Sequence, residues 1–186
     1  MLSEEIRQEI MAEVRSSFED RERIIEIFLE ELYAPGDLDP DEVSMAVDEA
    51  IQAYEATKAS WPAVTDCDRL DLAFARLEEL GIISLHNAGY TSSDGYEDFK
   101  EARDNRHDPS KVRGYCYYHG QDLSRAVSGG GLYLAFGPAD PKHEESEGPA
   151  IGSIVTQVME EQGLQVDWNG SFEKRIHLPK FDWKKR

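Results

Sequence analysis

Two side chains that can exchange protons, His119 and Asp122, lie three residues apart, directly after the tyrosine-rich segment 114–118. Imidazole titrates near neutral pH, and a carboxylate beside it can orient it as a general base or share a metal ion with it. Alternate residues of a strand share one face, so Tyr117 and His119 should point to the same side. We therefore take His119 and Asp122 as candidate catalytic residues, and Tyr117 and Gln121 as candidate ligand-binding residues.

A structural role for the same turn stays open beside the catalytic one. Gln121 or Asp122 can cap a helix over residues 122–127, while the ring of His119 packs into the protein. The two interpretations predict different burial. A catalytic site needs His119 and Asp122 at an open, concave pocket, whereas a cap leaves them buried with their hydrogen bonds satisfied.

A second candidate position follows the apolar segment 82–85, where His86 and Asn87 begin a loop. If this segment and the tyrosine-rich strand are parallel neighbours, His86 and His119 lie at the same sheet edge, near Asp94. Two histidines without i, i+4 spacing or a His-Glu-x-x-His motif fall short of a metalloenzyme signature. We take His86 and Asn87 as candidate ligand-binding residues and expect no resident metal and no cofactor.

Sequence patterns disfavour three common chemistries. Glycines 129–131 follow a predicted helix and precede a strand, whereas phosphate-binding glycines precede a helix. We expect backbone geometry to explain them, with a positive φ at Gly130. No Gly-x-Ser-x-Gly motif is present, so the α/β-hydrolase reading fails. Cys67 and Cys116 are too isolated for a metal site or a disulfide framework, and we expect two reduced, buried thiols.

Apolar periodicity and capping residues predict a helical region before the tyrosine-rich segment. Asp39 followed by Pro40 is a typical helix start, and residues 20–33 have apolar side chains around most of the circumference, which predicts a largely buried helix. The predicted helices cover residues 2–18, 20–33, 39–60, 65–80, 94–105, 122–127 and 150–162. Residues 137–148 are polar and rich in proline and glutamate, which predicts a flexible loop.

The predicted strands indicate an α+β fold. They cover residues 82–85, 114–118, 132–136, 164–168 and 175–178, and residues 114–137 have the order of a βαβ-like unit with two interior strands. Asn169-Gly170 is a typical two-residue hairpin turn. We expect acidic amino-terminal helices packed with a mixed sheet of about five strands and covering helices. A chain of 186 residues suits a single domain, with a helical subregion over 1–62 and an α/β subregion over 63–186.

The charge of the chain is strongly negative and uneven. Its formal net charge is −18, and residues 1–60 hold 17 Asp and Glu against 5 Lys and Arg. Such a field repels phosphates, so we expect no nucleic-acid partner and favour a basic protein partner for the acidic helices. The basic segment 180–186 is expected to pair within the chain. No apolar run suits a membrane span and no secretory signal is evident, which favours the cytoplasm and no membrane partner.

Two motifs resemble an uncharacterised bacterial family, a domain of unknown function. They are Tyr-His-Gly-Gln-Asp at 118–122 and Gly-Gly-Gly-Leu-Tyr-Leu-Ala-Phe-Gly at 129–137. The similarity covers residues 81–91, 114–137 and 163–183 and closes on the basic segment 182–186. The resemblance implies a fold and a bacterial source, but no activity. Some relatives have closely spaced cysteines where this chain has His86-Asn-Ala-Gly89, so no thiolate chemistry carries over.

These observations favour a cytoplasmic bacterial binding or regulatory module without catalytic activity, in which the acidic helices form the partner surface. The alternative is a small hydrolase or metal-dependent enzyme centred on His119, Asp122 and His86. Whether the protein is an enzyme stays open at this point.

Overall fold

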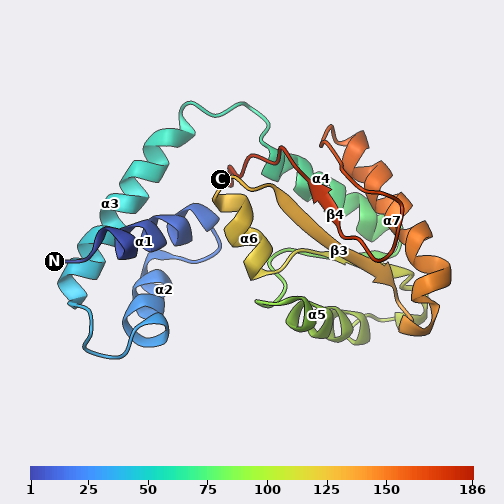
Figure 1. The fold of residues 1–186 in the computed structure, drawn as a ribbon, viewed down its shortest axis with the longest axis horizontal. Coiled ribbons are helices and arrows are strands. Elements are labelled where there is room, and N and C mark those ends of the chain that lie inside the picture. The colour runs from blue at the N-terminus through green and yellow to red at the C-terminus, as the bar shows by residue number, and fades with distance from the viewer. The chain divides into compact units, whose positions relative to one another are not determined.

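The computed structural model describes residues 1–186, which form two compact units. The helical unit consists of Met1–Thr65 together with Lys184–Arg186, and the sheet unit consists of Asp66–Trp183. In Figure 1 the colours run from blue to teal through residues 1–65 and from green to red through the sheet unit, and residues 184–186 are at the red end. The single cooperatively folding domain expected from the sequence stays a prediction.

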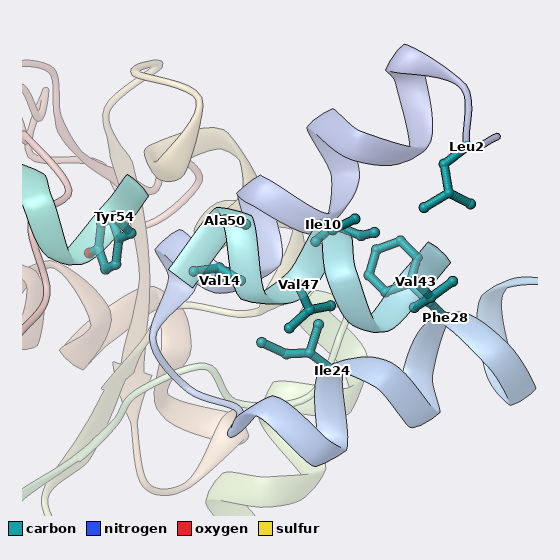
Figure 2. Packing of buried hydrophobic residues seen from close by; sticks show 10 residues of the cluster. Leu2, Ile10, Val14, Ile24, Phe28, Val43, Val47, Ala50 and Tyr54 are labelled. Atoms are coloured by element: carbon teal, nitrogen blue, oxygen red, sulfur yellow. The ribbon is translucent and has the colours of Figure 1, made fainter. Parts of the chain in front are cut away.

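Three helical segments and a common apolar core make up most of the helical unit. They are α1 (Glu4–Ser16), α2 (Arg21–Glu26), which continues into the π-helix η1 (Ile27–Leu32), and α3 (Pro40–Lys58). The side chains of Ser3, Asp20 and Asp39 cap α1, α2 and α3 by accepting backbone N–H bonds. Figure 2 shows the core, where side chains from all three helices and η1 meet.

The predicted helix 20–33 is less buried than its composition suggested. Ile24 and Phe28 are buried, but Ile25, Ile27 and Leu29 are only partly buried, and Leu32 is exposed. From Ile27 on, the helix widens to π geometry. The apolar side chains lie around most of the circumference, whereas only one side of the helix contributes to the buried cluster of the unit.

The last three residues of the sequence belong to the helical unit. The backbone carbonyl of Lys185 accepts a hydrogen bond from the Tyr54 hydroxyl at 2.9 Å, and the Arg186 guanidinium donates to the Pro62 carbonyl at 2.6 Å. The Lys185 ammonium lies 5.1 Å from the centre of the Phe18 ring. Lys185 and Arg186 therefore contact the helical unit through backbone carbonyl groups and an aromatic ring.

The sheet unit contains a mixed sheet in the order β1-β2-β3-β4, which confirms the α+β class. Its strands are β1 (Ile82–Leu85), β2 (Gly114–Tyr117), β3 (Leu132–Pro138) and β4 (Ile176–Leu178). β1 and β2 are parallel neighbours, as the His86 argument required, and α5 (Ser92–Asp104) connects them. β2 and β3 are the interior strands.

The βαβ-like prediction for residues 114–137 was wrong in strand direction. β3 runs antiparallel to β2, and β4 antiparallel to β3. The helix between them, α6 (Gly120–Val127), has only eight residues, and the chain returns to the sheet at the end where β2 left it. A parallel crossover must instead carry the chain back to the other end of the sheet.

The sheet has four strands rather than five. Of the predicted strand 164–168, only Asp167 pairs with β4, through two backbone hydrogen bonds with His177 of 2.8 and 3.1 Å. The following residues leave the ladder because the Trp168 indole donates to the Ser171 and Lys174 carbonyls, both at 3.0 Å. The connection is therefore a longer loop, and Asn169-Gly170 does not form a two-residue hairpin.

Helices cover both faces of the sheet (Figure 1). One face packs against α4 (Asp66–Glu79) and α7 (Glu144–Glu161), and the other packs against α5. Residues 137–148, predicted as a flexible loop, contain the end of β3, the short 3-10 helix η3 (Pro141–His143) and the first turn of α7. A second 3-10 helix, η2 (Pro109–Lys111), precedes β2. None of the helices is long and apolar enough to cross a membrane.

Candidate functional site

The turn between β2 and α6 holds both candidate catalytic residues. β2 is buried along its whole length, and His119 occupies the N-cap position of α6. The helix therefore begins at Gly120, two residues before the predicted start, and Asp122 is its third residue. From there the Asp122 carboxylate accepts a hydrogen bond from the backbone N–H of His119 at 3.4 Å. Asp122 thus caps the helix from within its first turn.

Asp122 is also the centre of an ionic cluster with His119 and Arg175. The His119 Nε2 atom lies 3.1 Å from Asp122 Oδ2, and Arg175 Nη1 donates to both carboxylate oxygens at 2.9 and 2.8 Å. Arg175 Nη1 also lies 3.2 Å from His119 Nε2. The side chains of His119 and Asp122 are 5% and 2% exposed, whereas that of Arg175 is 40% exposed. Arg175 is thus the solvent-facing member of the cluster.

The environment of His119 favours the neutral imidazole. Burial lowers the pKa of His119, and the Arg175 charge lowers it further, while the carboxylates of Asp122 and Asp94 act in the opposite direction. Nε2 faces Asp122 and Arg175, but the buried Nδ1 atom has no hydrogen-bond partner. The ring therefore has one unused nitrogen, and it is enclosed rather than open to solvent.

An aromatic pair adjoins this cluster on β3 and β4. Tyr133 and His177 are cross-strand partners, and their rings stack at 4.1 Å with an interplanar angle of 8°. The guanidinium groups of Arg175 and Arg125 lie over the Tyr133 ring, at 5.0 and 5.5 Å from its centre. Cation–π contacts of this kind orient arginine side chains. They hold Arg175 in position for Asp122.

His86 has different partners from His119. Its Nδ1 atom lies 3.1 Å from the Tyr118 hydroxyl and its Nε2 atom 3.4 Å from Asp71 Oδ1. Its ring packs on Phe74 at 4.5 Å. His86 contacts Tyr118 and Asp71, whereas His119 contacts Asp122 and Arg175. The two imidazoles therefore share no partner, although β1 and β2 are parallel neighbours. No group of three or more His, Cys, Asp or Glu side chains in residues 1–186 is arranged to hold a metal ion.

The loop that contains Asn87 covers the start of α6. Asn87 has a φ of 47°, which turns the chain back toward β2. The backbone N–H groups of Gly120 and Gln121 donate to the carbonyls of Gly89 and Tyr90 at 2.9 and 3.2 Å. These helix-start N–H groups therefore do not face an anion, and the Gln121 side chain points to solvent in an exposed position.

Tyr117 lines an open cavity. Its hydroxyl donates to the Ser92 carbonyl at 2.7 Å. The cavity, called the tyrosine pocket below, has a volume of about 430 Å³. It is lined by Ser92, Ser93, Tyr96, Glu97, Tyr115, Tyr117, Pro141 and Glu144. The pocket contains neither His119 nor Asp122, so Tyr117 is separate from the two candidate catalytic residues.

Arg175 is the site residue that the sequence did not reveal. It lies 53 residues from Asp122 in the chain, directly before β4, whose pairing with β3 was not predicted. Its position in the returning segment 175–178 was the only available signal. The sequence did predict the proximity of His119 and Asp122, since three residues separate them. The functional roles of these and the other candidate residues stay predictions.

Comparison with known proteins gives a family without an assigned role. A family model described as "Domain of unknown function (DUF6891)" matches residues 1–186. The match agrees with the expected resemblance to an uncharacterised family and extends it over the helical unit. No curated protein and no solved structure matches the chain.

Proposed function

The chain belongs to the DUF6891 family, a domain of unknown function, and from this premise we propose that it is a binding module without catalytic activity of its own. In this proposal the protein is bacterial and cytoplasmic, and it binds a basic protein partner through its acidic helices. The surface that carries the proposal lies around η1 and the start of α3 in the helical unit.

That surface combines exposed apolar side chains with uncompensated carboxylates. Leu32 and Met45 are 60% and 58% exposed. Exposed carboxylates with no ion pair flank them in the sequence, namely Glu30, Asp37 and Asp41. Neighbouring Glu26 and Glu31 differ, because Arg23 pairs with both. Exposed apolar groups bordered by one sign of charge favour a partner that is apolar and of opposite charge, hence basic.

The alternative of a small hydrolase or metal-dependent enzyme centred on His119, Asp122 and His86 has weaker support. The unpartnered Nδ1 of His119 favours it, because a general base needs a free nitrogen. Against it, His119 and Asp122 are buried and His86 has other partners. The binding module requires none of these residues to meet a substrate.

The test is binding of a designed amphipathic helical peptide of Lys and Leu, followed by fluorescence anisotropy at low and moderate salt. The test variant carries Glu30→Lys, Asp37→Lys and Asp41→Lys. A matched control carries Glu145→Lys, Glu160→Lys and Glu173→Lys, three exposed carboxylates of the sheet unit that also form no ion pair. Both variants have the same net charge.

We expect the peptide to bind the native protein in a salt-dependent manner. The helical-unit variant should lose about tenfold or more in affinity, and the control much less, because close charge pairs at an interface contribute more than the overall field. Equal losses in the two variants would reduce the effect to net charge and contradict the proposed surface.

A further inference from the structure

The tyrosine pocket has three aromatic walls, from β2 and α5. The Tyr115 and Tyr117 rings lie 5.6 Å apart with an interplanar angle of 22°. The Tyr96 ring meets Tyr115 edge-on, at 5.5 Å and 69°. Alternation along β2 places Tyr115 and Tyr117 on the same face of the sheet, where α5 supplies Tyr96. The rings form a fixed corner at one side of an open cavity.

The charged groups that line the pocket are both carboxylates, Glu97 and Glu144. Burial raises the pKa of Tyr115, and the charges of Tyr117 and Glu144 raise it further. Tyr115 therefore remains a neutral phenol with an electron-rich ring face. No Lys, Arg or His lines the cavity, so its electrostatics disfavour anions and favour a cation.

The chain already binds one of its own ammonium groups next to this pocket. Lys100 Nζ lies 5.6 Å from the centre of the Tyr96 ring and forms an ion pair with the Glu97 carboxylate at 2.5 Å. An aromatic ring and a carboxylate of α5 thus contact an ammonium group that the same helix carries. Lys100 thus compensates the negative charge of Glu97, whereas Glu144 is half-buried and forms no ion pair. Glu144 is the carboxylate left to pair with a ligand.

We propose that the tyrosine pocket binds an alkylammonium cation, with its charge paired to Glu144 and its alkyl chain against the rings of Tyr96, Tyr115 and Tyr117. This site goes beyond the proposed function, because it lies in the sheet unit and does not use the acidic helices. The same chemistry belongs to a lysine side chain of a partner protein and to a free small amine. Ring faces attract such cations, and carboxylates complete the site.

The test is an NMR titration of the full chain with n-butylammonium chloride, read from the backbone amides of Ser92 and Ser93. Neutral 1-butanol is the uncharged control ligand. Glu144→Gln removes the charge from the pocket, and Glu145→Gln is a matched control because it changes the next residue of the same helix turn, outside the pocket. Melting temperatures of both variants confirm that they fold.

We expect saturable shifts with butylammonium and weaker ones with 1-butanol. Glu144→Gln should weaken butylammonium binding about tenfold, and Glu145→Gln less than about twofold, because the Coulomb energy decreases with distance and screening. The absence of saturable shifts at Ser92 and Ser93, or equal weakening by both substitutions, would overturn the proposal.

A second titration, with a short peptide that contains one lysine, separates the two sources of the cation. Tighter binding of the peptide than of butylammonium supports a partner lysine as the ligand. Binding of butylammonium alone supports a free amine, because the pocket then excludes the peptide backbone. The amphipathic-peptide experiment tests a different surface, because its helical-unit variant changes Glu30, Asp37 and Asp41, none of which lines the pocket. Its failure would leave this result unaffected.

Discussion

Asp122 combines two roles that have different electrostatic requirements. As a capping group it needs only an oxygen atom to accept the His119 N–H, and an amide provides one. As the partner of Arg175 it needs its negative charge. Because the carboxylate is buried, loss of Arg175 would leave a charge without its counter-ion, which is costly in proteins.

We predict that Asp122→Asn lowers the free energy of unfolding by about 1.5–3 kcal/mol, the usual value of hydrogen bonds to a charged group. A cap without an ionic role predicts almost no loss. Urea denaturation of Asp122→Asn, Arg175→Gln and the double variant measures the coupling, which we expect to be about 0.5–3 kcal/mol. An Asp122→Asn protein as stable as the native one would rule out the ionic role.

The pH dependence of stability provides a test of His119. Its pKa in the folded protein lies below the ordinary value of 6.5, so the unfolded chain takes up a proton more readily than the native protein does. The free energy of unfolding should therefore be fully retained above that pH and decrease as the pH falls below it. His119→Phe should remove this part of the decrease. If the free energy of unfolding of the native protein and of His119→Phe depended on pH in the same way, the neutral, buried imidazole would be contradicted.

At the residue scale, sequence separation decided what could be predicted. His119 and Asp122 share a turn, so their spacing alone brought them together. Arg175 meets Asp122 only because β4 pairs with β3, and no local pattern carries that information. The tyrosine pocket was missed for the same reason. Tyr117 was singled out, but Tyr96 and Glu144 reach it from α5 and α7.

At the scale of elements, the glycine run between α6 and β3 has the positive φ angles that the sequence predicted, but at other positions than the predicted one. Gly129 and Gly131 have positive φ angles of 81° and 73°, whereas Gly130, the residue we expected, does not. The run does serve backbone geometry, since it ends α6 and starts β3. A left-handed residue is needed at both ends of the turn rather than at its centre.

We predict that Gly131→Ala destabilises the protein more than Gly129→Ala. Both substitutions place a Cβ atom at a positive φ, which costs about 1–2 kcal/mol. At Gly129 the new atom meets nothing within 4 Å, but at Gly131 it would lie 2.7 Å from His177 Nε2 and from the Leu178 carbonyl. Thermal denaturation of the two variants measures the difference. Equal losses of stability in the two variants would show that β4 can move away from the new Cβ atom without an energetic penalty.

The prediction of a strand was wrong where a segment is buried on one side but its backbone does not pair with the sheet. The segment 164–168 alternates because Leu164 is buried and Val166 and Trp168 are partly buried, yet its backbone joins the sheet at Asp167 alone. Alternation indicates a segment buried on one side, and a strand is only one way to achieve it. Helix starts were more predictable, as with Asp39 before Pro40, because capping is local.

At the scale of the whole molecule, the two units carry equal formal charge. The helical unit has 17 Asp and Glu against 8 Lys and Arg, and the sheet unit has 21 against 12, which gives −9 for each. The sequence suggested a field concentrated in the first third. Residues 184–186 return three cations to the helical unit and remove that imbalance. The proposed basic partner must therefore recognise local features such as Leu32 and Asp37 rather than net charge.

We predict that deletion of residues 184–186 destabilises the helical unit by about 1–3 kcal/mol, the value of a few hydrogen bonds and one cation–π contact. The deletion removes the carbonyl that Tyr54 bonds and the Arg186 contact with Pro62. Lys185→Ala keeps the carbonyl and should cost less. Hydrogen exchange of α3 amides reports the effect, and unchanged protection in the deletion variant would contradict it.

The two crossings of the chain, after Thr65 and after Trp183, also constrain the order of folding. All of the sheet unit lies between them in the sequence, so a growing chain presents the complete sheet unit before the residues that finish the helical one. The helices of residues 1–65 must therefore wait for residues 184–186. Until then Tyr54 lacks its hydrogen bond to the Lys185 carbonyl, so the helical unit of a nascent chain stays incomplete while the sheet unit can already fold.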